Sequence, residues 1–483
     1  MRFLRYIIGI VLAIAYFVCS RTWLAHVIYY NGEHSTFLYG SSFRSSFIAT
    51  EGVVAYINSW LGAMMAHPLA GPLLLAILCA SVYYLADALI RAIFRRPDLL
   101  ALSVGASILT FASASAIDSK LTAVWAVPTA LAVILAIVAA DNRLCRRKPV
   151  KPWTFLHGKA DWIWTAAVVA WGAWGYLHIL HSINLSERAM LLTERAARAH
   201  DYDEVIARAD NYLSQGKTNM LMSLFRNLAL AEKGILPDHL LDYPMPFGAE
   251  GLCFAWRSDS RQSEYGAPVY EAIGHVNEAQ RWESEALVVW GATPRRLAAL
   301  ARYNIAMGRP DAARKFIRLL AKAPFRSSEA AELMKIADSG QVEGLRNSLL
   351  NEGQNPARWA NVADVTPELE AICAIDSTNT VARQYLLCEL LLRNNVSRFI
   401  ELLPVIGPEG PLPRLYQEAL MLTSLRPGVE PPMINRISDR VKADFRRYIS
   451  SSSKGNPTAL RGEFGNTYWY YLNHISPYGH AAR

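Results

Sequence analysis

The chain has 483 residues, 52% of them hydrophobic, and a formal net charge of +8 at pH 7. Residues 1–181 hold 14 Lys and Arg against 7 Asp and Glu, whereas residues 182–483 hold 35 basic and 34 acidic residues. A nucleic-acid-binding domain should carry its positive charge as a patch on a folded soluble surface. Here the excess lies beside hydrophobic segments, which argues against nucleic-acid binding and indicates a protein held in a lipid bilayer.

Five segments within residues 1–181 are apolar and long enough to cross a membrane. A helix that spans a hydrocarbon core of about 30 Å needs about 20 mostly apolar residues. The predicted spans are residues 3–19, 69–90, 99–117, 121–140 and 162–181. We therefore expect residues 1–181 to form a transmembrane domain.

Basic residues flank these spans on alternate sides and predict how the chain crosses the bilayer. Loops rich in Lys and Arg are retained in the cytoplasm. Three clusters precede the first span, separate the second from the third and separate the fourth from the fifth: Arg2 and Arg5; Arg91, Arg95 and Arg96; Arg143, Arg146, Arg147, Lys148, Lys151 and Lys159. With all three clusters inside, the N-terminus is cytoplasmic and residues 182–483 form an extracytoplasmic domain.

The first span could instead be a cleaved signal peptide, because a basic start precedes its apolar run. However, Val18-Cys19-Ser20-Arg21 offers no small-x-small cleavage site, which favours an uncleaved anchor. In the outer loop that follows, apolar residues recur at helical spacing between Val53 and Met65. This pattern predicts an amphipathic helix in the membrane interface, with Trp60 at headgroup level. A helix that packs over the bundle is favoured over a substrate-binding re-entrant element.

The third span is rich in Ala, Ser and Gly, so we expect it to lie centrally in the bundle, because small residues let helices approach closely in lipid. Ionisable residues at mid-membrane would indicate transport. Asp87, Asp118 and Lys120 lie near the ends of spans instead, which argues against an ion-coupled transporter.

Residues 182–483 read as successive amphipathic helices with a 34-residue register. The aligned pairs are Gly274 with Gly308, Asn277 with Asp311, and Ala279 with Ala313. Each Gly should close one helix, each Asn or Asp should cap the next, and each Ala should permit close helix contact. The pattern predicts an all-α protein, in which a bundle of about five transmembrane helices precedes a tetratricopeptide-like (TPR-like) α-solenoid. A non-repeating helical bundle is the alternative.

No motif predicts a catalytic, cofactor-binding or metal site. Ser451 and Lys454 match the Ser-x-x-Lys pattern of acyl-serine enzymes only within a run of serines. His178 and His181 share a helical face, but a metal site needs at least a third ligand. A polar cap at the membrane surface is the favoured interpretation of this pair.

The aromatic run Tyr468-Trp469-Tyr470-Tyr471 could bind a ligand or contact the membrane, but packing as a terminal cap of the solenoid is favoured. The outer domain holds three cysteines, Cys253, Cys373 and Cys388, an odd number without regular spacing. A Cys373–Cys388 disulfide is one reading, and buried free thiols are the favoured one.

Four phrases in order carry a resemblance to a known family: Glu51-Gly-Val-Val-Ala-Tyr56, Asn227-Leu-Ala-Leu-Ala231, Tyr416-Gln-Glu-Ala-Leu420 and Phe464-Gly-Asn-Thr-Tyr-Trp469. Together they resemble an uncharacterised family of multi-pass inner-membrane proteins of Bacteroides-type bacteria. The chain departs from the family pattern at Glu51, where a glycine pair is more usual. The resemblance implies an inner-membrane location with a TPR-like periplasmic domain, and it carries over no catalytic residues.

Two hypotheses for function follow. The first is a membrane-anchored scaffold or a protein- or peptide-binding protein with partners in the periplasm, because helical-repeat solenoids expose long concave surfaces. The second is a membrane enzyme or accessory subunit in envelope glycan or lipid handling, whose active groups would be His26, His34, Arg44 and His67. It requires these four side chains to converge on one pocket at the membrane surface. The sequence favours the first, non-enzymatic role and specifies no oligomeric state.

Overall fold

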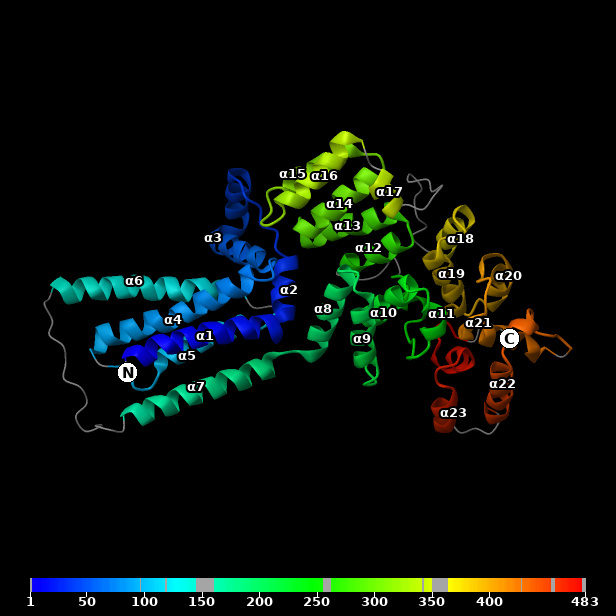
Figure 1. The fold of residues 1–483 in the computed structure, drawn as a ribbon, viewed down its shortest axis with the longest axis horizontal. Helices are drawn as coiled ribbons and strands as arrows, with labels where there is room; N and C mark the ends of the chain where they lie inside the picture. Colours follow the sequence, from blue (N-terminus) through cyan, green and yellow to red (C-terminus); the bar gives the residue numbers. More distant parts are fainter. Residues whose placement is uncertain are drawn as a thin grey trace. The chain divides into compact units, whose positions relative to one another are not determined.

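The computed structural model describes residues 2–95, 97–117, 120–144, 160–254, 262–340, 343–349, 364–426, 428–452 and 457–479. Throughout these ranges the fold is helical and contains no strand (Figure 1), so the prediction of an all-α protein is confirmed. Several residues named in the sequence-based predictions lie outside the described ranges: Arg96, Asp118, Arg146, Arg147, Lys148, Lys151, Lys159 and Lys454.

The chain divides into two compact units. Unit 1 comprises Met1–Leu192 with the short segments Ala292–Arg295 and Leu319–Ala330. Unit 2 comprises Thr193–Gly291, Arg296–Arg318 and Ala331–Arg483. The helices up to the boundary are α1 (Arg2–Thr22), α2 (Ala25–Glu33), α3 (Ser41–Met65), α4 (Ala70–Phe94), α5 (Leu102–Ala112), α6 (Thr122–Leu144), α7 (Ala160–Ser182) and α8 (Leu185–Arg198), with the boundary inside α8.

Three helices in the described part of unit 1 are long and apolar enough to cross a membrane, namely α4, α6 and α7. Tyr6–Thr22 of α1 and the whole of α2 meet at a 72° bend and provide a fourth if the pair counts as one span. In Figure 1, α1 and α6 lie along either side of α4, with which both are in contact. Three to four candidate spans indicate membrane association, and five are not evident.

The difference lies in residues 99–117, which were predicted to span but contain only the 11-residue helix α5. Such a helix is about 16 Å long, roughly half of the hydrocarbon core. The Asp98 carboxylate accepts hydrogen bonds from the main-chain N–H and the hydroxyl of Ser103, at 2.8 and 2.7 Å, and so fixes the start of α5. After the helix, the hydroxyls of Ser113 and Ser115 bond main-chain carbonyls three residues earlier. Such local bonds compete with continuation of the helix.

Although α5 is short, it contacts α4, α6 and α7. This position agrees with the prediction, from its small residues, that the segment lies centrally in the bundle. A Cβ atom added to Gly105 would lie 2.5 Å from the ring of Trp171, so the backbone of α5 approaches α7 closely. The Ser107 hydroxyl lies 2.9 Å from that of Tyr16 in α1 and donates to the Cys79 carbonyl in α4 at 2.7 Å. Small and hydroxylated side chains thus join four helices of unit 1.

Helix α3 contains the segment predicted as an interfacial helix and is kinked at Gly52, whose φ is 87°. Beyond the kink the helix is not simply amphipathic, because Leu61, Ala63 and Met65 are buried. Trp60 packs against the core of unit 1. Asn58 accepts a hydrogen bond from the Trp125 indole at 2.9 Å, which ties this half of α3 to α6. These contacts favour the packing helix over the re-entrant element.

Unit 2 continues as a long series of short helices, of which residues 294–295, 319–320 and 327–330 belong to unit 1. They are α9 (Tyr202–Leu213), α10 (Met220–Glu232), α11 (Leu236–His239), η2 (Gly248–Gly251), α12 (Ser263–Ala272), α13 (Val276–Trp290), α14 (Pro294–Ala306), α15 (Pro310–Leu320), α16 (Ser327–Ser339), α17 (Glu343–Leu349), α18 (Thr366–Ile375), α19 (Thr380–Leu392), α20 (Val396–Ile406), α21 (Arg414–Met421), η4 (Leu422–Leu425), η5 (Ile434–Arg436), α22 (Asp439–Ser452), α23 (Pro457–Phe464), α24 (Tyr468–Tyr470) and η6 (Tyr471–Ile475). Consecutive helices pack together in the pairs α9–α10, α12–α13, α18–α19 and α19–α20.

The 34-residue repeat predicts the glycines that close helices correctly, but it predicts the wrong capping residues. Gly274 and Gly308 follow α12 and α14 with φ of 79° and 71°, a conformation that favours glycine. His275, however, caps α13, because its side chain accepts the N–H of Glu278. Asn277 lies inside α13, and Asp311 lies in the first turn of α15. Each loop is therefore two residues shorter than predicted, and α15 begins with proline, which suits a first helical position.

The core of unit 2 contains charged groups as well as apolar ones, and the charges are paired. Arg296 and Glu264 are exposed by only 0% and 2%, and their side chains are joined at 2.7 Å. A polar contact of the same kind joins His275 Nε2 to a carboxylate oxygen of Glu368 at 3.1 Å, with similarly little exposure. Burying a charge is costly unless a partner replaces its water, so these pairs restrict how the helices can be arranged.

Replacement of Gly266 in α12 by alanine tests how closely α12 packs against α13. A Cβ atom there would lie 2.2 Å from the indole of Trp282, whereas one added to Gly462 in α23 meets nothing within 4 Å. Gly462→Ala should raise stability by about 0.5–1 kcal/mol, because alanine favours the helix. Gly266→Ala should lower it by about 1–3 kcal/mol through overpacking. Thermal unfolding midpoints of the full-length protein in detergent provide the measurement, and equal shifts for the two variants would contradict the packing.

Candidate functional site

The C-terminal aromatic run is held inside unit 2 rather than displayed on its surface. Tyr468 and Trp469 are fully buried, and Tyr471 is exposed by only 1%. The Tyr468 and Tyr471 hydroxyls donate to the carbonyls of Leu391 and Leu392, at 2.8 and 2.7 Å. These carbonyls end α19, where few intrahelical N–H groups are left to bond them; that of Leu391 also accepts the main-chain N–H of Asn394 at 3.0 Å. The aromatic run therefore closes the end of another helix, which agrees with the packing reading.

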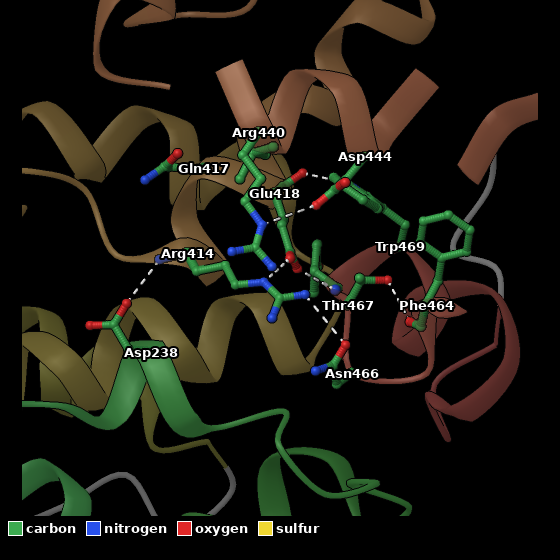
Figure 2. A network of polar contacts seen from close by, with 12 residues as sticks. Asp238, Arg414, Gln417, Glu418, Arg440, Asp444, Phe464, Asn466, Thr467 and Trp469 are labelled. Carbon is green, nitrogen blue, oxygen red and sulfur yellow. Dashed lines mark hydrogen bonds and ion pairs between the residues drawn. The ribbon is translucent and has the colours of Figure 1, made fainter. Parts of the chain in front are cut away.

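Glu418 in α21 is the centre of the polar network around this run (Figure 2). One carboxylate oxygen accepts the main-chain N–H of Tyr468 at 2.7 Å, and the other accepts Arg414 Nε at 2.6 Å. The main-chain carbonyl of Glu418 accepts the indole N–H of Trp469 at 2.7 Å. One residue thus bonds the C-terminal run with both its side chain and its main chain.

Arg414 extends the network in two directions, as Figure 2 shows. Its main-chain N–H donates to the Asp238 carboxylate at 3.0 Å, and its guanidinium donates to Asn466 at 3.3 Å. Thr467 caps α24 by accepting the N–H of Tyr470. Three segments distant in the chain therefore meet at α21.

This network is suited to holding the fold rather than to chemistry. Glu418 is only 2% exposed, and both of its carboxylate oxygens are occupied. Burial raises the pKa of Glu418, while Arg414 and the Tyr468 N–H act in the opposite direction. Two of the phrases that carry the family resemblance, residues 416–420 and 464–469, meet in this network. Their residue types are explained by this mutual packing.

The four outer-loop residues of the enzyme hypothesis contact separate neighbours. His26 is buried in α2, and Arg44 is exposed on α3. His34 stacks on Tyr30 with ring centres 4.1 Å apart. His67 accepts the N–H groups of Leu69 and Ala70, and its ring lies against that of Phe325. These contacts do not support the convergence that the hypothesis requires.

The remaining candidate residues from the sequence are His178, His181, Ser451 and Lys454. His178 and His181 are exposed near the end of α7, where His178 stacks on Trp174. Within the described ranges, no group of three or more His, Cys, Asp and Glu could hold a metal ion. Ser451 lies in the last turn of α22, and its proposed partner Lys454 is outside the described residues.

The cysteines that the structure describes are free thiols, and Cys253, Cys373 and Cys388 are buried. The alternative of a Cys373–Cys388 disulfide is therefore not adopted. Burial raises the pKa of the Cys373 thiol to about 12, so it is protonated and unreactive near neutral pH.

A cluster of polar residues that no sequence pattern predicted lies on unit 2. His200 Nδ1 is 2.9 Å from the hydroxyl of Tyr202, and the Glu232 carboxylate adds to the effect of burial in raising the pKa of this hydroxyl. Close by, Glu271 accepts the hydroxyl of Tyr303 at 2.6 Å. We refer to His200, Tyr202, Glu232, Glu271 and Tyr303 as the acidic cluster.

Two carboxylates share this cluster, and their charges oppose one another. Partial burial raises the pKa of Glu232, and the negative charge of Glu271 adds to this effect. His200 and the Tyr202 hydroxyl act in the opposite direction. Glu271 is also paired with Arg302 at 3.2 Å. Glu232 lies at the exposed end of α10, where a molecule from solution can reach it.

Sequence patterns could not identify the acidic cluster, because its members come from four helices and one loop over about a hundred residues. Glu232 ends α10 and Glu271 precedes the end of α12, and neither position belongs to a recognised motif. Their proximity depends on how the helix pairs pack, which no local spacing encodes.

Comparison with known proteins places the chain in a family. A model described as a family of unknown function (DUF6057) matches residues 151–475. The chain belongs to this family. The match includes α7, nearly all of unit 2, the acidic cluster and the Glu418 network, but not residues 1–150. No curated protein and no solved structure matches the chain significantly.

Membership of the DUF6057 family confirms the expectation of an uncharacterised family. It assigns no substrate, partner or activity, and the Bacteroides-type origin and the TPR-like domain stay predictions. A proposal for the function therefore has to rest on how the residues of unit 2 are arranged.

The Glu418 network can be tested by substitution. Glu418→Ala should lower the free energy of unfolding by about 1–3 kcal/mol, because the buried Tyr468 N–H loses its acceptor. Glu463→Ala is the matched control: Glu463 pairs with Arg447 at the surface, with 45% of its side chain exposed, and its loss should change stability by about 1 kcal/mol or less. Thermal or urea unfolding of the full-length protein compares the two. Equal effects would contradict the role assigned to Glu418.

Proposed function

We propose that this protein is a membrane-anchored scaffold or protein- and peptide-binding protein, with residues 1–181 in the bacterial inner membrane and residues 182–483 in the periplasm. The observation that supports this best is that consecutive helices of unit 2 pack in pairs, namely α9–α10, α12–α13 and α18–α19, and that Gly274 closes the first helix of one such pair. Stacked helical pairs of this kind expose extended surfaces for partner chains.

The proposal includes a TPR-like α-solenoid and five membrane crossings. The fifth crossing would be residues 99–117, in which α5 supplies the helical part. Irregular backbone at membrane depth is tolerated where other protein covers it. The buried flanks of α5, including Ala101 and Ala114, fit that condition.

Engineered cysteines test the orientation. The native Cys253 is buried and unsuited to labelling, so a chain without native cysteines should receive single cysteines at Arg440 or Arg143. Arg440 is 88% exposed on α22, and Arg143 is exposed near the end of α6. A membrane-impermeant maleimide should label Arg440→Cys in intact spheroplasts and Arg143→Cys only after lysis, because the basic loop is expected inside. The reverse pattern would disprove the orientation.

Site-specific photocrosslinking tests the binding role. A photoreactive residue at Asp203, which is 85% exposed beside the acidic cluster, should capture a discrete protein in living cells. The same residue at Asp439, fully exposed on α22, serves as the control for random encounters. Mass spectrometry would identify the partner. Identical products at both positions, or none at a series of exposed positions over unit 2, would refute the scaffold proposal.

A further inference from the structure

The loop between α15 and α16 belongs to unit 1, although the chain on both sides of it belongs to unit 2. The segment Leu319–Ala330 is part of unit 1, whereas the flanking residues up to Arg318 and from Ala331 onward are part of unit 2. The main-chain N–H of Tyr39 donates to the carbonyl of Lys322 in this loop at 2.7 Å. The ring of Phe325 lies 4.9 Å from that of His67. The loop is therefore attached to the segments that directly precede α3 and α4.

These contacts place the loop at one end of two candidate membrane spans. His67 accepts the main-chain N–H groups of Leu69 and Ala70, at 3.2 and 3.1 Å, where α4 begins. Helix α3 also reaches the start of α6, because the Asn58 side chain donates to the hydroxyl of Thr122 at 2.8 Å. Figure 1 shows α3 at this end of both helices. Since α4 and α6 are long and apolar enough to cross a membrane, their beginnings mark the level of the membrane surface.

Three large apolar side chains are exposed where these segments meet. Tyr39, Leu69 and Phe325 are 52%, 50% and 51% exposed. We refer to these three residues, together with Lys322, as the interfacial patch. The contacts described above join its members, because Lys322 and Phe325 belong to the same loop. A single exposed apolar side chain needs no explanation, but a joined group of them marks an interaction site.

The backbone holds Phe325 in this exposed position. Its φ is 61°, in the left-handed region that bulky residues rarely adopt. The two preceding residues, Ala323 and Pro324, are buried, so the exposed ring directly follows a packed stretch of the loop. Backbone strain of this kind persists only where the surrounding structure enforces it, and it is concentrated at functional segments.

Positive charge accompanies the apolar side chains. Lys322 is exposed, and so is Arg44 in the first turn of α3, five residues after Tyr39. Within the described part of the chain, neither of these two cations has an ion-pair partner. In contrast, the neighbouring Arg326 is paired with a carboxylate at 2.9 Å. Free cations beside exposed aromatic rings are suited to the headgroup region of a membrane.

We propose that the interfacial patch is a membrane-contact element additional to the spans. It places Phe325 between the headgroups and the acyl chains, while Lys322 and Arg44 bind the phosphate groups of anionic phospholipids. This inference rests on the proposed placement of unit 1 in the membrane. In that orientation the lipids belong to the periplasmic leaflet.

The position of the patch selects lipid as its occupant. Leu69 directly precedes α4, so the lipids that surround this span extend to the patch. Aromatic rings are favoured at this depth because they bury an apolar body, and basic side chains can reach the phosphate layer from the same depth. The loop therefore presents an apolar group and a cation to the two parts of the interface that accept them.

Quenching by lipids tests the contact in the full-length protein. A chain without native cysteines, carrying Phe325→Cys labelled with the fluorophore NBD, is reconstituted into nanodiscs of phosphatidylcholine and phosphatidylglycerol. The fluorophore should emit at a shorter wavelength than in water, and phospholipids with a nitroxide near the headgroup should quench it. Leu425→Cys, at a similarly exposed position in unit 2, is the matched control and should show neither effect.

The ionic contact is tested by removing one charge. In the chain labelled at residue 325, Lys322→Gln should reduce the preference for quenching by nitroxide-labelled phosphatidylglycerol over phosphatidylcholine about fivefold, because each basic side chain near an anionic surface adds to the attraction. Lys217→Gln, at an exposed position in unit 2, should leave the preference unchanged. An unchanged preference in Lys322→Gln would overturn the assignment of the headgroup to Lys322.

The proposal is overturned if the fluorophore at residue 325 emits as in water. It is also overturned if the fluorophore is shielded but not quenched by lipid, because a partner protein or a second copy would then cover the patch. Val133→Cys, similarly exposed in the middle of α6, separates this failure from failure of the membrane placement. A nitroxide deep in the acyl chains should quench a fluorophore there. Quenching at residue 133 alone removes only the interfacial patch, whereas quenching at neither position removes the placement of unit 1 in the membrane.

Discussion

Polar and charged groups lose their water when helices pack, and each then needs a partner within the protein. This constraint organises both units. In unit 2, Arg296 meets Glu264, His275 meets Glu368, and Glu418 meets Arg414 and the main chain of Tyr468. Apolar contacts supply most of the burial, but they tolerate many arrangements. The buried pairs restrict which helix ends can meet.

The same requirement shapes unit 1, whose long helices also expose large apolar side chains on their outer faces. Tyr16, Ser107 and the Cys79 carbonyl connect three helices, and Asn58 connects α3 to α6 through Trp125. In lipid, such bonds and close contacts between small residues replace the hydrophobic drive that water provides elsewhere.

The long apolar helices could be predicted from the sequence because composition alone determines them. α4, α6 and α7 coincide closely with predicted spans. The length of the helix within residues 99–117 was overestimated. Average hydrophobicity does not reveal that the Asp98 carboxylate bonds the start of α5, or that hydroxyl groups bond the adjacent backbone. In unit 2 the register identified the glycines that close helices but not His275 as a cap. The Glu418 network and the acidic cluster arise from packing between distant segments, which no local pattern reveals.

The position of Trp469 in the interior has a consequence for biosynthesis. The core of unit 2 is completed by residues 468–471, which bond to α19 and α21, and these two helices are made earlier. Helix pairs can form as synthesis proceeds, yet the end of α19 and the Glu418 carboxylate gain these partners only after residues 468–471 have been made. A nascent chain that stops short of Tyr468 would therefore leave the apolar interior of unit 2 open at this end.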